Sequence, residues 1–137
     1  MTRGIRNHNP GNIDYNAATR WAGQLMHNPA IESRFCRFES PVFGIRALCK
    51  LLLTYQKKYG IDTVAGIILR WAPSIENNTL AYIDSVAKSC GVKDTQSIIV
   101  ADYLDPLAKA IIQHENGSQP YSDETIRSAI HMATGGK

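Results

Sequence analysis

From residue 41 to residue 132, apolar side chains recur every three or four positions, and the runs are separated by glycine, proline and capping residues. Such a stripe is typical of an amphipathic helix, which buries its apolar face against a partner. The longest run follows Ser40 and Pro41, a favourable cap and first helical residue, and it ends at Gly60. Its predicted inward positions are Ile45, Leu48, Leu52, Tyr55 and Tyr59. Residues 41–137 are therefore predicted to fold as packed helices.

The same pattern predicts the remaining helices, and we interpret Glu76-Asn77-Asn78 as helix capping. Their expected limits are Asp62 or Thr63 to Pro73, Asn78 or Thr79 to Gly91, Asp105-Pro106 to Asn116-Gly117, and Ser122 to about Met132, with one short helix over Thr95–Tyr103. Their predicted apolar positions are Val64, Ile67, Ile68 and Trp71, then Leu80, Ile83, Val86 and Cys90, then Leu107, Ala110, Ile111 and His114.

Residues 1–40 differ, because they are rich in Asn, Gly and Arg and contain the turn signal Asn9-Pro10-Gly11-Asn12. Short β-forming segments at 13–15, 21–25 and 34–38 predict a small irregular antiparallel sheet. We therefore expect an α+β fold that is mostly helical. In this fold, residues 1–137 form a single domain, with a turn-rich small sheet in residues 1–40 against a helical bundle in 41–137.

The composition excludes several classes of protein. No apolar run approaches the roughly 20 residues that cross a bilayer, so no membrane segment is expected. The first eight residues lack the apolar part of a secretory signal, which predicts synthesis in the cytoplasm and delivery by another route. Three widely spaced cysteines, Cys36, Cys49 and Cys90, are predicted to be free thiols. The four histidines are scattered and no phosphate loop occurs, so neither a metal nor a cofactor is indicated.

A net charge of +3 suits contact with an anionic polymer, such as a cell wall or a nucleic acid. Arginines and aromatic residues enrich the first third of the chain, which is one pattern of a nucleic-acid surface. The arginines do not cluster on one helix, and the aromatic residues have an evident core role, so nucleic acid is the weakest alternative. The arginines are Arg3, Arg6, Arg20, Arg34, Arg37 and Arg46.

Two carboxylates are candidates for chemistry. Glu115 lies in the last turn of a predicted helix, where the negative end of the helix dipole disfavours a second negative charge. This position is expected to raise the pKa of the carboxyl group, which a general acid requires near neutral pH. The alternative is a solvated helix-end residue. Glu32 lies at a predicted hairpin tip, either as a solvated turn residue or as a second carboxylate over a cleft. Asn9 and Asn12 either close their turn or bind a sugar through their amides.

The opening of the chain, Arg3-Gly4-Ile5-Arg6-Asn7-His8-Asn9-Pro10-Gly11-Asn12-Ile13, resembles the RGIRNxNPGNI signature of a phage and prophage family often labelled a virion structural protein. The resemblance covers nearly the whole chain. It continues through Trp21-Ala22-Gly23, Phe35-Cys36-Arg37-Phe38, Gly44-Ile45-Arg46-Ala47, Arg70-Trp71-Ala72-Pro73 and His114-Glu115-Asn116-Gly117.

A weaker resemblance is to lysozyme-like peptidoglycan hydrolases, in which a helix ends at a catalytic Glu and a turn with Asn and Gly follows. No acidic residue precedes Asp14 here, whereas residues 107–117 look similar to that helix. We therefore expect a circularly permuted lysozyme-like domain, with residues 114–121 lying against residues 7–13. The resemblance implies that Asn9, Asn12, Gln119 and Tyr121 line the sugar cleft.

The predicted function is cleavage of peptidoglycan glycan strands by a phage-type enzyme that acts in the cell wall or from the virion. Glu115 would be the general acid. A hydrolase would use Glu32 as its second carboxylate, whereas a lytic transglycosylase needs one carboxyl only. The alternative is a non-enzymatic virion or glycan-binding protein, with other virion proteins as partners, since a fold does not fix a function.

Overall fold

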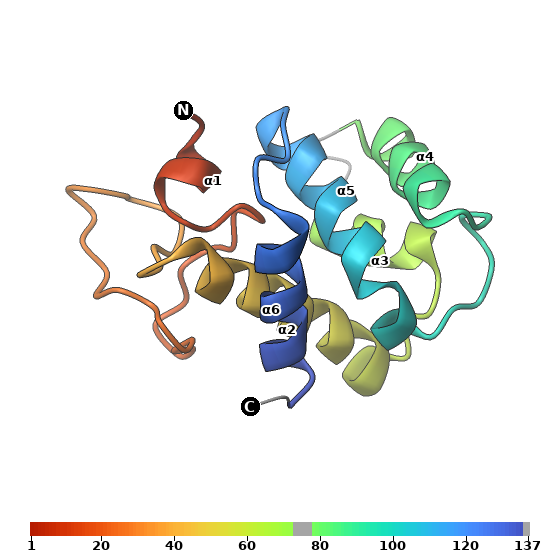
Figure 1. The fold of residues 1–137 in the computed structure, drawn as a ribbon, viewed down its shortest axis with the longest axis horizontal. Helices are drawn as coiled ribbons and strands as arrows, with labels where there is room; N and C mark the ends of the chain where they lie inside the picture. Colours follow the sequence, from red (N-terminus) through yellow and green to blue (C-terminus); the bar gives the residue numbers. More distant parts are fainter. Residues whose placement is uncertain (73–77, 136–137) are drawn as a thin grey trace.

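The structure is a computed structural model, and it describes residues 1–72 and 78–135. Beyond residue 40, helix α2 packs against α6, and α4 packs against both α3 and α5 (Figure 1). Residues 1–40 lie at one end of α2 as loops around a single short helix. The elements are α1 (Arg3–Arg6), α2 (Pro41–Tyr59), α3 (Val64–Trp71), α4 (Thr79–Cys90), η1 (Val100–Tyr103), α5 (Leu104–Asn116) and α6 (Asp123–Ala133).

The predicted helices are present in the described residues, but the short helix expected over residues 95–103 covers only Val100–Tyr103, and α5 begins at Leu104. Thr63 and Ser122 cap α3 and α6 by accepting a hydrogen bond from a backbone N–H of the first turn, at 3.1 Å in both cases. Helices α2, α4 and α5 end at Gly60, Gly91 and Gly117, whose φ angles of 67°, 69° and 74° favour glycine. Asn78 caps α4, whereas Pro73, Glu76 and Asn77 lie outside the described residues.

The main core lies between α2 and the helices that cover it, and most predicted inward positions are buried there. Leu80 and Tyr59 are exposed instead, at 80% and 47%, and His114 is exposed as well, whereas Trp71 and Cys90 are partly buried. In α4 the buried face is centred on Tyr82, Ile83 and Val86, which leaves Leu80 at the solvent edge of the first turn. The largest fully buried side chains include Ile45, Leu48, Leu52, Ile67, Ile68, Leu107, Ile111, Ile112 and Ile126.

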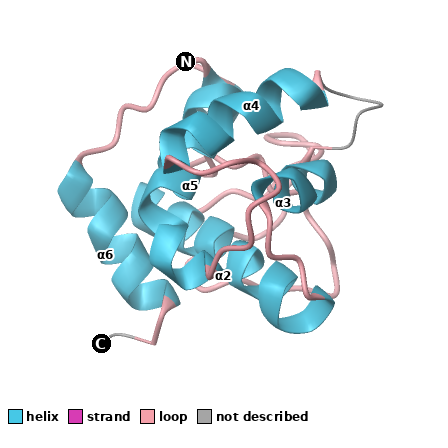
Figure 2. Cartoon of the chain, turned by 90° about the vertical axis from the view of Figure 1, so that its right-hand side faces the viewer, coloured by secondary structure: helices cyan, strands magenta, loops and turns pink. Residues whose placement is uncertain are grey.

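The predicted α+β class is wrong, because residues 1–72 and 78–135 contain helices and no strand (Figure 2). The lysozyme-like bundle with a small sheet is therefore corrected to helices with a looped N-terminal segment. Two isolated antiparallel bridges, Asp14 to Phe35 and Gln24 to Phe38, fall inside the predicted strand segments. Neither bridge extends into a ladder. Beside the first bridge, the Asn9 side chain bonds backbone atoms of Ile13 and Cys36, and beside the second, the Phe38 N–H donates to the Asn7 carbonyl.

A second, smaller core holds residues 1–40 to the helices. Ile13, Cys36 and Phe38 are buried together with Ala47 of α2, and Trp71 of α3 packs on them. The N-terminal segment also passes close to α2, since a Cβ atom placed on Gly44 would lie 1.9 Å from the His8 carbonyl oxygen. Glycine is therefore required at this point of the helix.

All three cysteines are free thiols, as predicted. Burial raises the pKa of Cys36 to about 11, of Cys49 to about 12 and of Cys90 to about 11, which keeps these thiols protonated at neutral pH. Among the described helices, none combines the length and the apolar character that crossing a membrane would require. Within the same residues, no three His, Cys, Asp or Glu side chains gather as a metal site would need.

Candidate functional site at the end of helix α5

Glu115 lies half-buried in the last turn of α5, where three distant parts of the chain meet. Its Oε1 atom accepts a hydrogen bond from Asn12 Nδ2 at 3.1 Å, and its Oε2 atom accepts one from the Tyr82 hydroxyl at 3.0 Å. These donors come from the N-terminal turn and from α4. Each carboxylate oxygen has two lone pairs, so one lone pair on each oxygen remains for a proton or a ligand. The two hydrogen bonds thus fix the orientation of the carboxylate and leave it able to accept further hydrogen bonds.

Tyr82 is fully buried, and its ring stacks on the exposed ring of His114, with 3.6 Å between centroids. Burial raises the pKa of Tyr82 far above its usual range, and the charge of Glu115 and the hydrogen bond to it act in the same direction. The hydroxyl therefore stays protonated and donates to Glu115. Tyr82 was not predicted from the sequence, because a tyrosine among apolar helix positions does not indicate which group its hydroxyl will contact.

The residue after Glu115 joins the N-terminal segment to α5. Asn116 Nδ2 donates to the Pro10 carbonyl at 2.8 Å and to the Ile112 carbonyl at 3.0 Å. Asn116 Oδ1 accepts from the Thr2 hydroxyl at 2.7 Å. Together with the bond between Asn12 and Glu115, these contacts confirm the expectation that residues 114–121 lie against residues 7–13.

The two predicted asparagines occupy different positions. Asn9 is completely buried, and its amide bonds backbone atoms of Ile13 and Cys36, so it closes the turn. Asn12 adopts the left-handed conformation with φ of 53°, which turns its side chain toward Glu115. Its buried Oδ1 atom has no hydrogen-bond partner among the described residues.

Glu32 is also buried, which excludes the predicted solvated turn residue. Its carboxylate accepts hydrogen bonds from the side chains of Arg3, Arg6 and Asn7, the last two at 3.2 and 3.0 Å. The backbone N–H groups of Arg34 and Phe35 donate as well, at 2.9 and 3.0 Å. The hydrogen bond from Arg3 lowers the pKa of Glu32 most strongly. Burial acts in the opposite direction, and the bonds from Phe35, Asn7 and Arg34 lower the pKa further, so that it lies well below its usual range.

Gln119 and Tyr121 lie in the loop between α5 and α6. The Gln119 side chain accepts from the Tyr121 backbone N–H at 2.7 Å and donates to the Tyr121 carbonyl at 3.1 Å. The Tyr121 hydroxyl is buried without a partner among the described residues. The hydrogen bonds of Gln119 thus shape the loop, and they do not bring its amide to Glu115.

Most arginines of the N-terminal third form ion pairs or hydrogen bonds with other residues of the chain. Arg3 and Arg6 pair with Glu32, and Arg34 pairs with Asp14 at 2.7 Å. Arg37 donates to the Met26 carbonyl at 2.8 Å, and both Arg3 and Arg34 lie over the Phe35 ring. These contacts account for the local enrichment in arginine without a nucleic acid.

No family model matches the chain. One curated relative, Protein P5 of Pseudoalteromonas phage PM2, is 40% identical to it over 130 residues, which span 93% of this chain and 79% of Protein P5. The chain belongs to the family of this phage protein. The expected phage resemblance is thereby supported. The RGIRNxNPGNI signature and the lysozyme-like resemblance of this chain have no such support and stay predictions.

Proposed function

We propose that this phage protein is a component of the virion. The observation that supports the proposal is its 40% identity to Protein P5 of phage PM2 along most of both chains. A fold in which residues 1–40 are fastened to the helices by a second core and by the hydrogen bonds of Asn116 suits a small structural part. Detection of the chain in purified particles tests the proposal.

The second candidate function, cleavage of peptidoglycan, is favoured by the setting of Glu115. Asn12 and Tyr82 hold the carboxylate from two sides, and positioning of this kind is what general acid catalysis requires. In this proposal a proton held on a free lone pair of Glu115 passes to the glycosidic oxygen between two amino sugars. The bond from C1 to that oxygen then breaks, with the leaving sugar taking the proton as its hydroxyl.

The setting of Glu32 favours a reaction with one carboxyl over one with two. Its oxygens are committed to arginine, asparagine and backbone donors, so we do not expect it to activate a water molecule. In the lytic transglycosylase reaction the C6 hydroxyl of the muramyl sugar attacks C1 and returns its proton to Glu115. The product is an anhydro sugar, which is lighter than the hydrolysis product by one water.

Digestion of purified peptidoglycan tests this second candidate. The parent chain is expected to release anhydro muropeptides, identified by mass spectrometry, and Glu115→Gln to release at least about a hundredfold less. The Tyr82 hydroxyl can rotate to accept from the new amide, so the variant should melt at or above the parent's temperature. Glu124→Gln, in the exposed first turn of α6, is the matched control and should keep full activity. A folded parent that releases nothing would eliminate cleavage and leave the structural role.

A further inference from the structure

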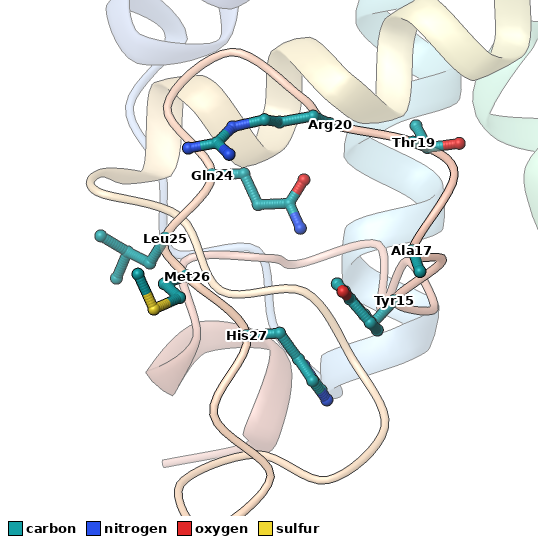
Figure 3. A pocket seen from close by; sticks show the side chains of 8 residues that line it. All are labelled: Tyr15, Ala17, Thr19, Arg20, Gln24, Leu25, Met26 and His27. Atoms are coloured by element: carbon teal, nitrogen blue, oxygen red, sulfur yellow. The ribbon is translucent and has the colours of Figure 1, made fainter.

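A surface hollow of about 180 Å³ lies within residues 15–27, lined by none of the residues that contact Glu115 (Figure 3). Two arms of the N-terminal segment form it, and both are fastened to residues 34–38. The Tyr15 N–H donates to the Arg34 carbonyl at 2.9 Å, and the Leu25 N–H donates to the Arg37 carbonyl at 2.8 Å. The hollow is therefore held open by the fold.

One wall of the hollow is aromatic. The rings of Tyr15 and His27 stack in parallel, with 3.8 Å between centroids and 6° between planes. Both side chains are half-buried, so the pair is fixed in place while part of it remains accessible. Such a wall offers an apolar face to a flat or ring-shaped ligand.

Two polar side chains of the hollow, Gln24 and Arg20, can donate to a ligand. The side-chain amide oxygen of Gln24 accepts from the Trp21 N–H at 2.9 Å, which leaves the amide N–H groups of Gln24 available. The exposed Arg20 guanidinium has no ion-pair or hydrogen-bond partner among residues 1–72 and 78–135. No Asp or Glu lines the hollow. A cation beside free amide donors, with no carboxylate, favours an oxyanion.

Arg20 stands apart from the other arginines of the N-terminal segment. Arg3 and Arg6 share the single carboxylate of Glu32, Arg34 pairs with Asp14, and Arg37 is bonded to a backbone carbonyl. Among the residues that line the hollow, Arg20 is the one with a cationic guanidinium. A nucleic acid would need a charged groove that follows its backbone, and the arginines held by Glu32 and Asp14 do not extend the charge of Arg20 into such a groove.

We propose that this hollow binds a monosaccharide unit carrying a carboxylate or phosphate group, with the oxyanion on Arg20 and the ring against Tyr15 and His27. The volume is below the roughly 300–1,000 Å³ of pockets for drug-sized ligands, which suits a single sugar. The site would attach the protein to an acidic bacterial surface polymer. This inference is independent of whether Glu115 cleaves glycan.

Titration of the isotope-labelled chain with glucuronic acid, glucose 6-phosphate and glucose, followed by NMR, tests the site. Backbone amide signals of residues 15–27 should shift with at least one acidic sugar, and the two acidic probes distinguish carboxylate from phosphate. Glucose should bind at least about tenfold more weakly. Arg20→Gln should weaken binding of the acidic sugar by a similar factor, whereas Arg127→Gln, which removes an exposed charge from α6, should not.

Several outcomes would overturn the proposal. Equal binding of glucose would remove the role of the oxyanion, and an equal effect of the two arginine variants would remove the role of Arg20. Shifts outside residues 15–27, or no shifts at all, would remove the site itself. A single-stranded oligonucleotide that displaces the sugars would point instead to a nucleic acid. The NMR spectrum of each variant reports at once whether it has kept the fold.

Discussion

At the scale of single residues, Glu32 and Glu115 show how differently two carboxylates of one chain are used. Glu32 is surrounded by donors and buried, whereas Glu115 accepts side-chain hydrogen bonds from Asn12 and Tyr82 and is half-buried. Sequence reasoning placed Glu115 correctly beside Asn12, because a helix end and a turn each have local signatures. It could not assign Glu32, because the arginines and asparagine that bind it come from 25 to 29 residues earlier.

Glu32→Gln is expected to lower the free energy of unfolding by about 2–3 kcal/mol, measured by urea denaturation. The amide would place its N–H₂ group against donors that now face a carboxylate, and hydrogen bonds to a charged group contribute about 1.5–3 kcal/mol. Arg3 and Arg6 are half exposed and can be solvated, which limits the loss.

Asp14→Asn is the matched control, because its ion pair with Arg34 is exposed on both sides. It should cost less than about 1 kcal/mol. Equal losses in the two variants would contradict a special role for the buried carboxylate.

Stability should fall as the pH drops, and Glu32 should carry part of the fall. Its pKa is lowered in the folded protein from an ordinary value of 4.5, so the unfolded chain binds more protons in acid. The contribution of Glu32 is complete above the unfolded pKa and is lost progressively below about pH 4.5. Urea midpoints measured between pH 6 and pH 3 should therefore fall less steeply in Glu32→Gln than in the parent. Parallel pH profiles would argue against this coupling.

At the scale of elements, the helices were predictable and the N-terminal segment was not. Helix caps such as Thr63 and Ser122, and stops such as Gly60, act through neighbouring residues and are visible in the sequence. The predicted sheet failed, because its segments meet in single bridges and Asn9 and Glu32 satisfy the adjoining backbone. Helix α1 has four residues, too few to produce a periodic pattern.

Gly44→Ala tests the docking of the N-terminal segment on α2. Alanine favours a helix over glycine by roughly 0.5–1 kcal/mol, but its Cβ would meet the His8 backbone carbonyl. We expect a net destabilisation of about 1–3 kcal/mol in thermal or urea unfolding.

Gly66→Ala, in α3, is the control for this substitution, because its nearest neighbour is a side-chain methyl group of Ile61 and not a backbone atom. Gly66→Ala should lower the free energy of unfolding clearly less than Gly44→Ala does. A stabilised Gly44→Ala variant would show that residues 8 and 9 do not lie against α2.

At the scale of the whole molecule, the ends of two elements far apart in sequence make one unit. Asn116 fastens α5 to the segment from Thr2 to Pro10, and Asn12 completes the surroundings of Glu115. The hollow beside Arg20 lies in the same N-terminal segment. The chain thus carries a looped segment on a helical support, and this segment bears the hollow beside Arg20 and supplies Asn12 to the site at Glu115.

Quantitative mass spectrometry of gradient-purified particles is the measurement that shows whether this chain is part of the phage particle. In a phage that carries this chain, its peptides should follow the major coat protein at a constant ratio across the gradient. That ratio should survive a high-salt wash, which removes proteins held by surface charge alone. A chain that is abundant in the lysate but absent from the particle fractions, or lost in the wash, would contradict the account.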